Sequence, residues 1–459
     1  MKKGRVFLFI VFMAAIIYTV YKFTPIINGN SINVDVISPI KYFSKNKDIT
    51  LNISDKLAGI KQISIQVVSM NTAINIYNKF FDTPDIKHFS IKIKPNRTIP
   101  EGSATIIIKV SDYSKNNFFN GFTKVVRRNV IVDSRPPVVD LLSGISRITE
   151  GGSALAIYYA KDNLNLKDIY LVVKYDGVKD KFKAYDASNL FGKKGVYLSF
   201  FSYGLSKTHN WSTNIVASDD AGNITKAHVP VYYSRLKIKK NRINITDNFI
   251  KTKVLTIFNN ENITPKDSLL SDFLYVNSAV RASDAAKIKN ICSSSENKFL
   301  WKNSFTQLID SKVTATFLDK RTYYYKGKMI GVTHHEGYDL ASTANARVNA
   351  ANSGRVVFEG YLGVYGNTLI IDHGFGVFSL YGHLQRFLVN VGDYVKRNQY
   401  VAITDTTGLA MGDHLHFDIL IDGYYVNPLE WWDKHWIRNH ITSVIDEAKV
   451  RLSLVTQTQ

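Results

Sequence analysis

The feature that most constrains this chain is a group of histidines and aspartates between Thr333 and Ile419. Eight of the eleven histidines lie at or after His334. The sequence reads Thr-His-His-Glu-Gly-Tyr-Asp at 333–339, Tyr-Gly-His at 381–383 and His-Leu-His-Phe-Asp at 414–418. Imidazole and carboxylate groups are the ligand types of a zinc site that keeps one position open. The last third of the chain is therefore expected to fold around a metal.

The stretch 414–419 alternates polar and apolar residues. On a β-strand alternate side chains share a face, so His414, His416 and Asp418 are expected on one face, with the apolar residues in the core. His335 and Asp339 lie four residues apart around a glycine. Three such ligands leave a position for water, whose pKa the ion lowers towards ~7. Further histidines would move its proton or stabilise an oxyanion. This set predicts a hydrolase.

Residues from about 312 to 432 resemble the LytM and lysostaphin type of zinc metallopeptidase, which cleaves peptide cross-links in bacterial peptidoglycan. The matching motifs are His335-Glu-Gly-Tyr-Asp339 for H-x-G-x-D, Tyr381-Gly-His383-Leu for Tyr-x-His-Leu and His414-Leu-His416 for H-x-H. The resemblance implies Zn²⁺ as the cofactor, with His335, Asp339 and His416 as ligands. It also implies His383 and His414 as catalytic histidines, and a compact antiparallel sheet with the site in a groove across it.

Three features of the motif region lie outside the assigned ligands and catalytic histidines. Residues 402–408, Ala-Ile-Thr-Asp-Thr-Thr-Gly, stand where the family commonly has Gly-x-x-Gly-x-Thr-Gly. Asp418 either orients a ligand histidine from behind or is a carboxylate at the sheet edge in water. His373 is expected to be structural, because the family carries it away from the ligands.

The charge balance indicates an anionic partner. The chain has 58 basic and 38 acidic side chains, a net charge of +20, which suits a polymer that carries carboxylates. The lysines are scattered and no nucleic-acid-binding fingerprint is present, so nucleic acid is not expected. The single cysteine, Cys292, excludes an intrachain disulfide and a thiolate zinc site.

The amino terminus predicts a membrane-associated location. Lys2, Lys3 and Arg5 precede an apolar run over 6–20, an order that keeps this end in the cytoplasm and sends the rest across the membrane. We expect residues 1–30 to be a single-pass anchor in the inner membrane, with the body on its periplasmic side. A cleaved signal peptide is the alternative, because the run is intermediate in length between the two.

Two repeated β units follow the amino terminus. Short alternating runs broken by turn residues predict antiparallel sandwiches over 31–133 and 134–235. A common offset of 107 residues relates Asp55-Lys-Leu57 to Asp162-Asn-Leu164, Ser111-Asp112 to Ser218-Asp219, and Asn116 to Asn223. A repeat near 100 residues fits one immunoglobulin-like sandwich per copy. The pair is expected to be a spacer, or else an arm that binds the wall or a partner.

The remaining segments complete a mainly β, multidomain prediction. Residues 236–312 are expected to be a partly helical linker region, with one helix beginning at Thr264 and Pro265. Residues 313–435 form the peptidase domain. Residues 436–459 form an amphipathic helix that packs on a neighbouring domain, because apolar residues recur there at intervals of three and four.

Three functions compete at this point. The first is a zinc endopeptidase that hydrolyses peptidoglycan cross-links, with peptidoglycan, the inner membrane and other cell-wall machinery as partners. The second is a catalytically inactive envelope scaffold that activates a separate cell-wall hydrolase. The third is an envelope adhesin that uses its sandwiches. For the enzyme, D-Ala to diaminopimelate bonds and glycine bridges are both open as the bond that is cut.

Overall fold

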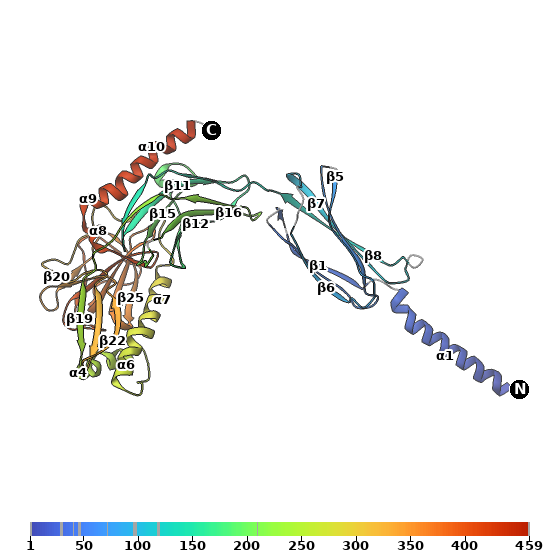
Figure 1. Ribbon diagram of the computed structural model, residues 1–459, viewed down its shortest axis with the longest axis horizontal. Helices are drawn as coiled ribbons and strands as arrows, with labels where there is room; N and C mark the ends of the chain where they lie inside the picture. Colours follow the sequence, from blue (N-terminus) through green and yellow to red (C-terminus); the bar gives the residue numbers. More distant parts are fainter. Residues whose placement is uncertain are drawn as a thin grey trace. The chain divides into compact units, whose positions relative to one another are not determined.

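The computed structural model describes residues 2–27, 31–39, 41–44, 47–70, 72–94, 99–116, 120–208 and 210–457. The chain forms two compact units. Unit 1 comprises Met1–Pro137, Asp162–Lys167 and Ser218–Ile224, and unit 2 comprises Val138–Lys161, Asp168–Ala217 and Thr225–Gln459. The structure is mainly β (Figure 1).

Unit 1 contains two sheets that share one hydrophobic core. One has the order β1-β3-β6 and the other β2-β8-β7-β4-β5. Ile53 of the first sheet and Ile65 of the second are both in this core, because alternate strand residues turn inward. The immunoglobulin-like class of this sandwich stays a prediction. The strands are β1 (Ile32–Ser38), β2 (Tyr42–Phe43), β3 (Ile49–Asp55), β4 (Ile60–Ser69), β5 (Thr72–Phe80), β6 (His88–Ile93), β7 (Gly102–Asp112) and β8 (Thr123–Val132).

The amino-terminal segment is helix α1 (Lys2–Ile27). Residues 1 and 28–30 of the expected anchor, and the side chains of Lys2, Lys3 and Arg5, lie outside the described part. No helix within the described ranges reaches the length and apolarity needed to cross a membrane. Anchoring by this segment stays a prediction.

Unit 2 begins with a second pair of four-stranded sheets, ordered β14-β15-β11-β9 and β13-β12-β16-β17, and a small pair β10-β18. The elements are β9 (Val138–Leu141), β10 (Ser146–Thr149), β11 (Ser153–Lys161), β12 (Leu166–Tyr175), β13 (Val178–Lys183), β14 (Tyr185–Asp186), α3 (Ser188–Phe191), β15 (Val196–Ser202), β16 (Ser212–Asp219), β17 (Ile224–His228) and β18 (Val231–Ser234). Their core continues without a break into the carboxy-terminal part of unit 2. The proposed boundaries at 134–235, 236–312 and 313–435 stay predictions.

The segment 236–312 is partly helical, as expected. It contains β19 (Lys240–Ile245), α4 (Asp247–Phe249), the π-helical turn η1 (Ile250–Val254), α5 (Leu255–Asn260), α6 (Leu269–Tyr275), the π-helical turn η2 (Val276–Val280) and α7 (Arg281–Ile291). The expected helix start at Thr264 is wrong, because α6 begins at Leu269. Ser268 caps it by accepting a hydrogen bond from the Ser271 N–H, and the Ser271 hydroxyl accepts one from the Ser268 N–H.

The carboxy-terminal part is built on an extended sheet with the order β20-β23-β30-β27-β26-β25-β28, whose paired strands are all antiparallel. These strands are β20 (Lys312–Ala315), β23 (Tyr338–Ala341), β30 (Leu415–Ile421), β27 (Val377–Phe387), β26 (Gly366–Asp372), β25 (Gly354–Leu362) and β28 (Tyr394–Val395). The short strands β24 (Arg347–Asn349), β29 (Tyr400–Thr404) and β31 (Tyr424–Val426) add to it, and the 3-10 turn η3 (Gly363–Tyr365) joins β25 to β26.

A second, three-stranded sheet joins the helical segment to the metal-site region. Strand β19 pairs in parallel with β21 (Lys320–Tyr325), which pairs with β22 (Lys328–His334). Strand β19 lies in the segment 236–312, for which the sequence predicts a partly helical linker. Its partner lies about 80 residues further along the chain, so no local pattern could reveal the pairing.

The chain ends in the helical segments α8 (Pro428–Trp432), α9 (Lys434–Ile437), the π-helical turn η4 (Arg438–Thr442) and α10 (Ser443–Gln457). Ile441, Ala448 and Leu452 are buried in the common core of unit 2. In Figure 1, α10 runs beside β11, and the two elements are in contact. The expected packing of this helix on a neighbouring part of the protein is therefore present.

Candidate metal centre

Strand register brings the motif residues together. Asp339 on β23 lies opposite His416 on β30, and Gly382 on β27 lies opposite His416 from the other side. His383 follows Gly382, and His335 lies in the connection between β22 and β23. Residues separated by up to 81 positions in the sequence thus meet at the centre of one sheet.

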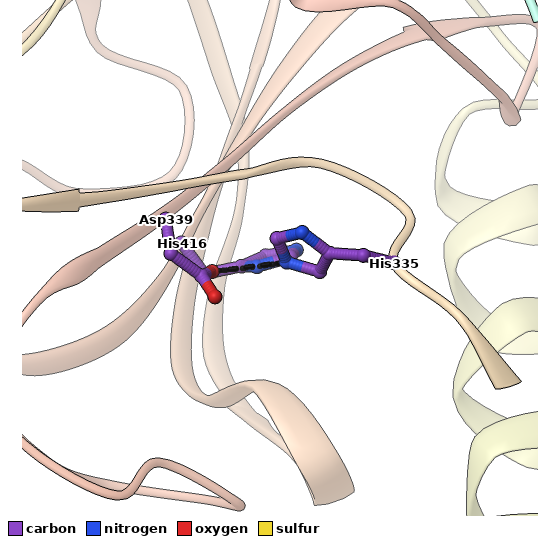
Figure 2. Close-up of side chains that lie close together, drawn as sticks. All are labelled: His335, Asp339 and His416. Atoms are coloured by element: carbon purple, nitrogen blue, oxygen red, sulfur yellow. Dashed lines mark hydrogen bonds and ion pairs between the residues drawn. The ribbon is translucent and has the colours of Figure 1, made fainter. Parts of the chain in front are cut away.

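The three expected metal ligands converge on one point (Figure 2). His335 Nε2 lies 3.0 Å from Asp339 Oδ1 and 3.1 Å from His416 Nδ1, and the latter two atoms are 2.9 Å apart. Zinc binds nitrogen and oxygen ligands at about 2.0–2.2 Å, which places neighbouring ligands of a tetrahedron about 3.3 Å apart. The donor set and its spacing fit a zinc ion with a fourth position open.

Hydrogen-bond partners behind the rings select which nitrogen faces inward. His335 Nδ1 lies 3.1 Å from the carbonyl oxygen of Thr316. A carbonyl only accepts, so this nitrogen donates and Nε2 keeps its lone pair for a metal. His416 is oriented the other way, with Nε2 lying 2.9 Å from Asp418 Oδ1 and Nδ1 facing the other ligands.

Asp418 is fully buried. Of the two interpretations of this residue, the structure supports the orienting carboxylate and contradicts the exposed one. His416 and Asp418 share a face of β30, as expected, and that face is buried as completely as the apolar one. Other parts of unit 2 cover both sides of the sheet, which the alternation of one strand could not indicate.

The two expected catalytic histidines lie beside this triangle. His383 donates from Nδ1 to the Thr407 carbonyl oxygen at 2.7 Å, and His414 donates from Nδ1 to the Gly412 carbonyl oxygen at 2.8 Å. In the neutral ring, Nε2 is then the acceptor nitrogen. The His383 and His414 ring centroids are 4.8 Å apart, and His414 Nε2 lies 3.5 Å from Asp339 Oδ1. His383 has a φ of +60°, a strained conformation that is common at functional sites.

The electrostatics of the site follow from burial and from its carboxylates. Burial lowers the pKa of His335 to about 4 and holds the pKa of His383 well below its usual value, so both rings are neutral near pH 7. Burial acts against the charged form of Asp339, but His335 and hydrogen bonds from the histidines hold its pKa well below the usual value. His416 behaves oppositely, since Asp418 and Asp339 overcome burial and raise its pKa to about 10.

All five motif residues line one pocket of about 290 Å³. The wall across from the motifs comes from the helical segment and β19, through Ile243, Phe249, Phe273 and Arg281. The expected linker region is therefore part of the site. Its contribution could not be derived from motifs, because these residues lie between 54 and 92 positions before His335.

Sequence analysis missed Arg321. Its Nη2 lies 2.7 Å from Asp339 Oδ2, the carboxylate oxygen that faces away from the histidine triangle. Arg321 lies on β21, outside every recognised motif. His373, in contrast, is as expected: it is fully buried and bonded to the Ser353 carbonyl and the Ser379 hydroxyl, away from the ligands.

Comparison with known proteins agrees with these motifs. The family model described as "Peptidase family M23" matches residues 333–428. DD-carboxypeptidase/endopeptidase Mpg of Neisseria meningitidis serogroup B is 37% identical over 95 residues, which are 21% of this chain and 22% of that protein. Murein hydrolase activator EnvC of Escherichia coli is 33% identical over 107 residues, 23% of this chain and 26% of that protein. The chain thus spans about a quarter of the length of these relatives.

Among solved structures, a zinc-containing peptidase from Vibrio cholerae matches with a TM-score of 0.27 and 16% identity. The match covers 71% of this chain and 80% of that one.

Proposed function

Residues 333–428 are a domain of peptidase family M23, and from this premise we propose that the protein is a zinc-dependent endopeptidase acting on peptide cross-links of bacterial peptidoglycan. The observation that carries the proposal is the triangle of His335, Asp339 and His416 donor atoms, 2.9–3.1 Å apart. Two further imidazoles stand beside it, each bonded through Nδ1 to a backbone carbonyl. An inactive relative would not need to keep all five groups in this arrangement.

His335 Nε2, Asp339 Oδ1 and His416 Nδ1 would hold the metal. Zinc bound there supplies Lewis acidity, which polarises a peptide carbonyl and makes water acidic near neutral pH. Asp418 keeps the His416 ring in the orientation that this requires. The Arg321 guanidinium occupies Asp339 Oδ2, which leaves Oδ1 as the ligand atom.

His383 and His414 would act as the general base and general acid. Each ring donates from Nδ1 to a backbone carbonyl, so each Nε2 is fixed as the atom that accepts or returns a proton. The low pKa of His383 keeps its Nε2 lone pair available at neutral pH. One of the two rings would accept a proton from the attacking water, and in protonated form either could donate to the developing oxyanion or to the leaving amine.

The substrate and location follow from charge and from the relatives. A net charge of +20 suits a polymer rich in carboxylates. The similarity to a DD-carboxypeptidase/endopeptidase favours the D-Ala to diaminopimelate bond over a glycine bridge. The basic residues and apolar run of α1 support an anchor in the inner membrane, with both units in the periplasm.

The test is digestion of purified sacculi by the full chain, with fragments analysed by mass spectrometry. Wild type should release un-cross-linked muropeptides. His416→Ala should lose both zinc and activity, whereas His383→Ala should keep zinc and lose at least about 100-fold in kcat, the usual weight of a general acid or base. His435→Ala, which changes an exposed histidine on α9, is the matched control and should behave as wild type. Zinc-loaded wild type that releases nothing would refute the proposal.

The relation to EnvC supports a second candidate, an activator of a separate cell-wall hydrolase. The two functions make opposite predictions for His383→Ala. An activator would stimulate its partner hydrolase equally well with this variant, because the surface fold is unchanged. An enzyme would fail in the sacculus assay with the same variant.

A further inference from the structure

A second group of potential metal ligands lies in unit 1, far along the sequence from the peptidase motifs. Carboxylate oxygens of Asp133, Asp162 and Asp219 all lie within 4.8 Å of one another. Asp133 follows β8, Asp162 follows β11, and Asp219 ends β16. Asp133 and Asp219 are fully buried and Asp162 is partly buried. Three like charges this close repel one another unless a cation lies between them.

The hydrogen bonds of the group leave acceptors unused. Asp219 is satisfied, since Asn223 donates to its two oxygens from N–H and from Nδ2, each at 2.8 Å. Asp133 accepts at Oδ1 from the Arg135 N–H, and Asp162 accepts at Oδ1 from the Leu164 N–H. Their Oδ2 atoms are buried and have no partner among the described residues. The Asp133 side chain is 1% exposed, so its unpartnered Oδ2 is shielded from solvent, and one of its carboxylate oxygens lies within 4.8 Å of those of Asp162 and Asp219.

No basic side chain in the described part of the chain forms an ion pair with these carboxylates. Burial raises the pKa of Asp162, and the charges of Asp219 and Asp133 raise it further. A buried ion without a counter-ion costs several kcal/mol. Among the described residues, the three carboxylates therefore have no basic side chain as a counter-ion.

The internal repeat provides a comparison within the molecule. Asp55 and Asp112 are the first-copy equivalents of Asp162 and Asp219, at 162 − 107 = 55 and 219 − 107 = 112. Both end strands and are buried, and among the described residues neither has a partner at Oδ2. Asp133 lies at the junction of the two copies; within the described residues it groups with the second aspartate pair, and no third carboxylate groups with the first pair. The aspartate pair thus belongs to the repeated turn, and the third carboxylate joins only one of the two pairs.

We infer that Asp133, Asp162 and Asp219 bind one calcium ion. All the donors are hard oxygens and there is no nitrogen or sulfur ligand, which favours Ca²⁺ over a transition metal. Calcium–oxygen distances of about 2.3–2.6 Å place opposite ligands about 4.6–5.2 Å apart, so atoms within 4.8 Å of one another can share one ion. The flexible coordination of calcium accommodates backbone carbonyls and waters as the remaining ligands.

Calcium would link three segments that are distant in the sequence. The end of β8, the loop 162–167 and the turn 218–224 all belong to unit 1, and one ion would hold them together. Sites of this kind in extracellular modules bind with Kd values of about 0.1–1 mM. The inference is independent of the peptidase proposal, because it involves none of the same residues.

The experiment titrates the full chain with calcium chloride, following heat of binding and the thermal unfolding of unit 1. Wild type should bind one calcium ion at the cluster and unfold at a higher temperature when it is present. Asp133→Asn and Asp162→Asn should each weaken binding at least about tenfold. Asp112→Asn is the matched control, since it makes the same change at the first-copy equivalent of Asp219. His416→Ala removes the peptidase metal ligand, and both controls should bind calcium as wild type does.

Several outcomes would overturn the inference. One is the absence of saturable calcium binding up to about 10 mM, well above the Kd range of extracellular sites. Another is calcium binding that Asp133→Asn and Asp112→Asn weaken to the same extent. Equal stabilisation by magnesium and calcium at the same concentration would contradict the choice of calcium. Asp162→Asn keeps the test decisive should Asp133→Asn fail to fold, because Asp162 is only partly buried.

Discussion

At the scale of single residues, the carbonyl or carboxylate group next to each imidazole determines which ring nitrogen faces the site. Thr316, Thr407 and Gly412 each present a carbonyl oxygen to a histidine Nδ1, and each forces Nε2 towards the pocket. His416 has a carboxylate behind it instead and presents Nδ1. Each of the four rings thus has one neighbour that selects its tautomer.

Asp418→Asn tests this control of His416. The amide can present NH₂ in place of a carboxylate oxygen, so His416 loses the negative charge 2.9 Å from its Nε2, and the ring loses both orientation and basicity. We expect zinc affinity to fall about 10–100-fold, the usual effect of removing such a partner. Competition with a chelator of known affinity measures it. Asp446→Asn, at an exposed position of α10, should change nothing, and equal zinc affinities for the two variants would refute this role.

Glu430 predicts a pH dependence of stability. It lies on α8 and accepts hydrogen bonds from the Ser153 N–H at 2.9 Å and from the Ser153 hydroxyl at 3.3 Å. Burial raises its pKa from 4.5 to about 7. The folded state therefore binds this proton more tightly than the unfolded state, and stability is lost as pH rises from about 4.5 to about 7.

The variant Glu430→Gln isolates this effect, because a neutral amide can still accept both hydrogen bonds. Relative to the variant, wild type should lose on the order of 2 kcal/mol of unfolding free energy between pH 5 and pH 8. Chemical denaturation of both proteins at each pH measures the difference. A difference that is the same at pH 5 and pH 8 would mean that Glu430 does not titrate in this window.

At the scale of elements, the register of β27 and β30 against β23 decides which motif residues meet. A slip of one residue would turn His416 to the opposite face of the sheet. The loop after β29 then fixes His383 through the Thr407 carbonyl. This loop packs on the β26 start, where Gly366 has a φ of +67° and its hydrogen faces Thr407.

Gly366→Ala should therefore impair catalysis from outside the pocket. A Cβ at 366 would lie 2.4 Å from Thr407 Oγ1 and 2.5 Å from the Thr407 carbonyl carbon, so this loop must move and His383 with it. We expect kcat to fall at least about tenfold with zinc content unchanged, since small displacements of catalytic groups are costly. Gly392→Ala is the control, because φ there is +96° and a Cβ meets nothing within 4 Å. Equal kcat values for the two variants would contradict the coupling.

At the scale of the whole molecule, the candidate metal centre lies entirely within one of the two compact units. The metal centre, the helical wall of its pocket and α10 all belong to unit 2. One continuous core, extending from β11 and β15 to β27 and β30, stabilises the metal-centre sheet and α10 together. A second core in unit 2 packs the helical wall on the same sheet, through Ile370, Phe378 and Leu420. Stabilisation by a ligand at the metal centre is therefore expected to spread through unit 2.

Zinc should protect unit 2 against hydrogen–deuterium exchange. At a thousandfold excess over Kd, a ligand specific to the folded state adds about 4 kcal/mol to the free energy of global opening. Peptides from β23, β27, β30 and α10 should exchange more slowly with zinc, whereas peptides from β4 and β7 in unit 1 should not change. His416→Ala should abolish the effect. Zinc protection confined to the few residues around the ligands would refute a common cooperative core.

The sequence by itself determined the chemistry of the site. The short motifs that contain His335, Asp339, His383, His414 and His416 are local patterns of the chain, and the structure brings all five residues to one pocket. The repeat of 107 residues was likewise readable, because Asp55 and Asp162, and Asp112 and Asp219, occupy matching strand ends. The helix at the carboxyl end followed from its apolar spacing.

Only the tertiary structure decided the surroundings of these residues. The burial of Asp418, the ion pair of Arg321 with Asp339 and the pocket wall from Ile243 to Arg281 depend on contacts between distant segments. The meeting of Asp133 with Asp162 and Asp219 is of the same kind. Residue type and local periodicity fix which face a side chain takes on its own element, but its neighbours come from the packing of other elements, which a local pattern does not encode.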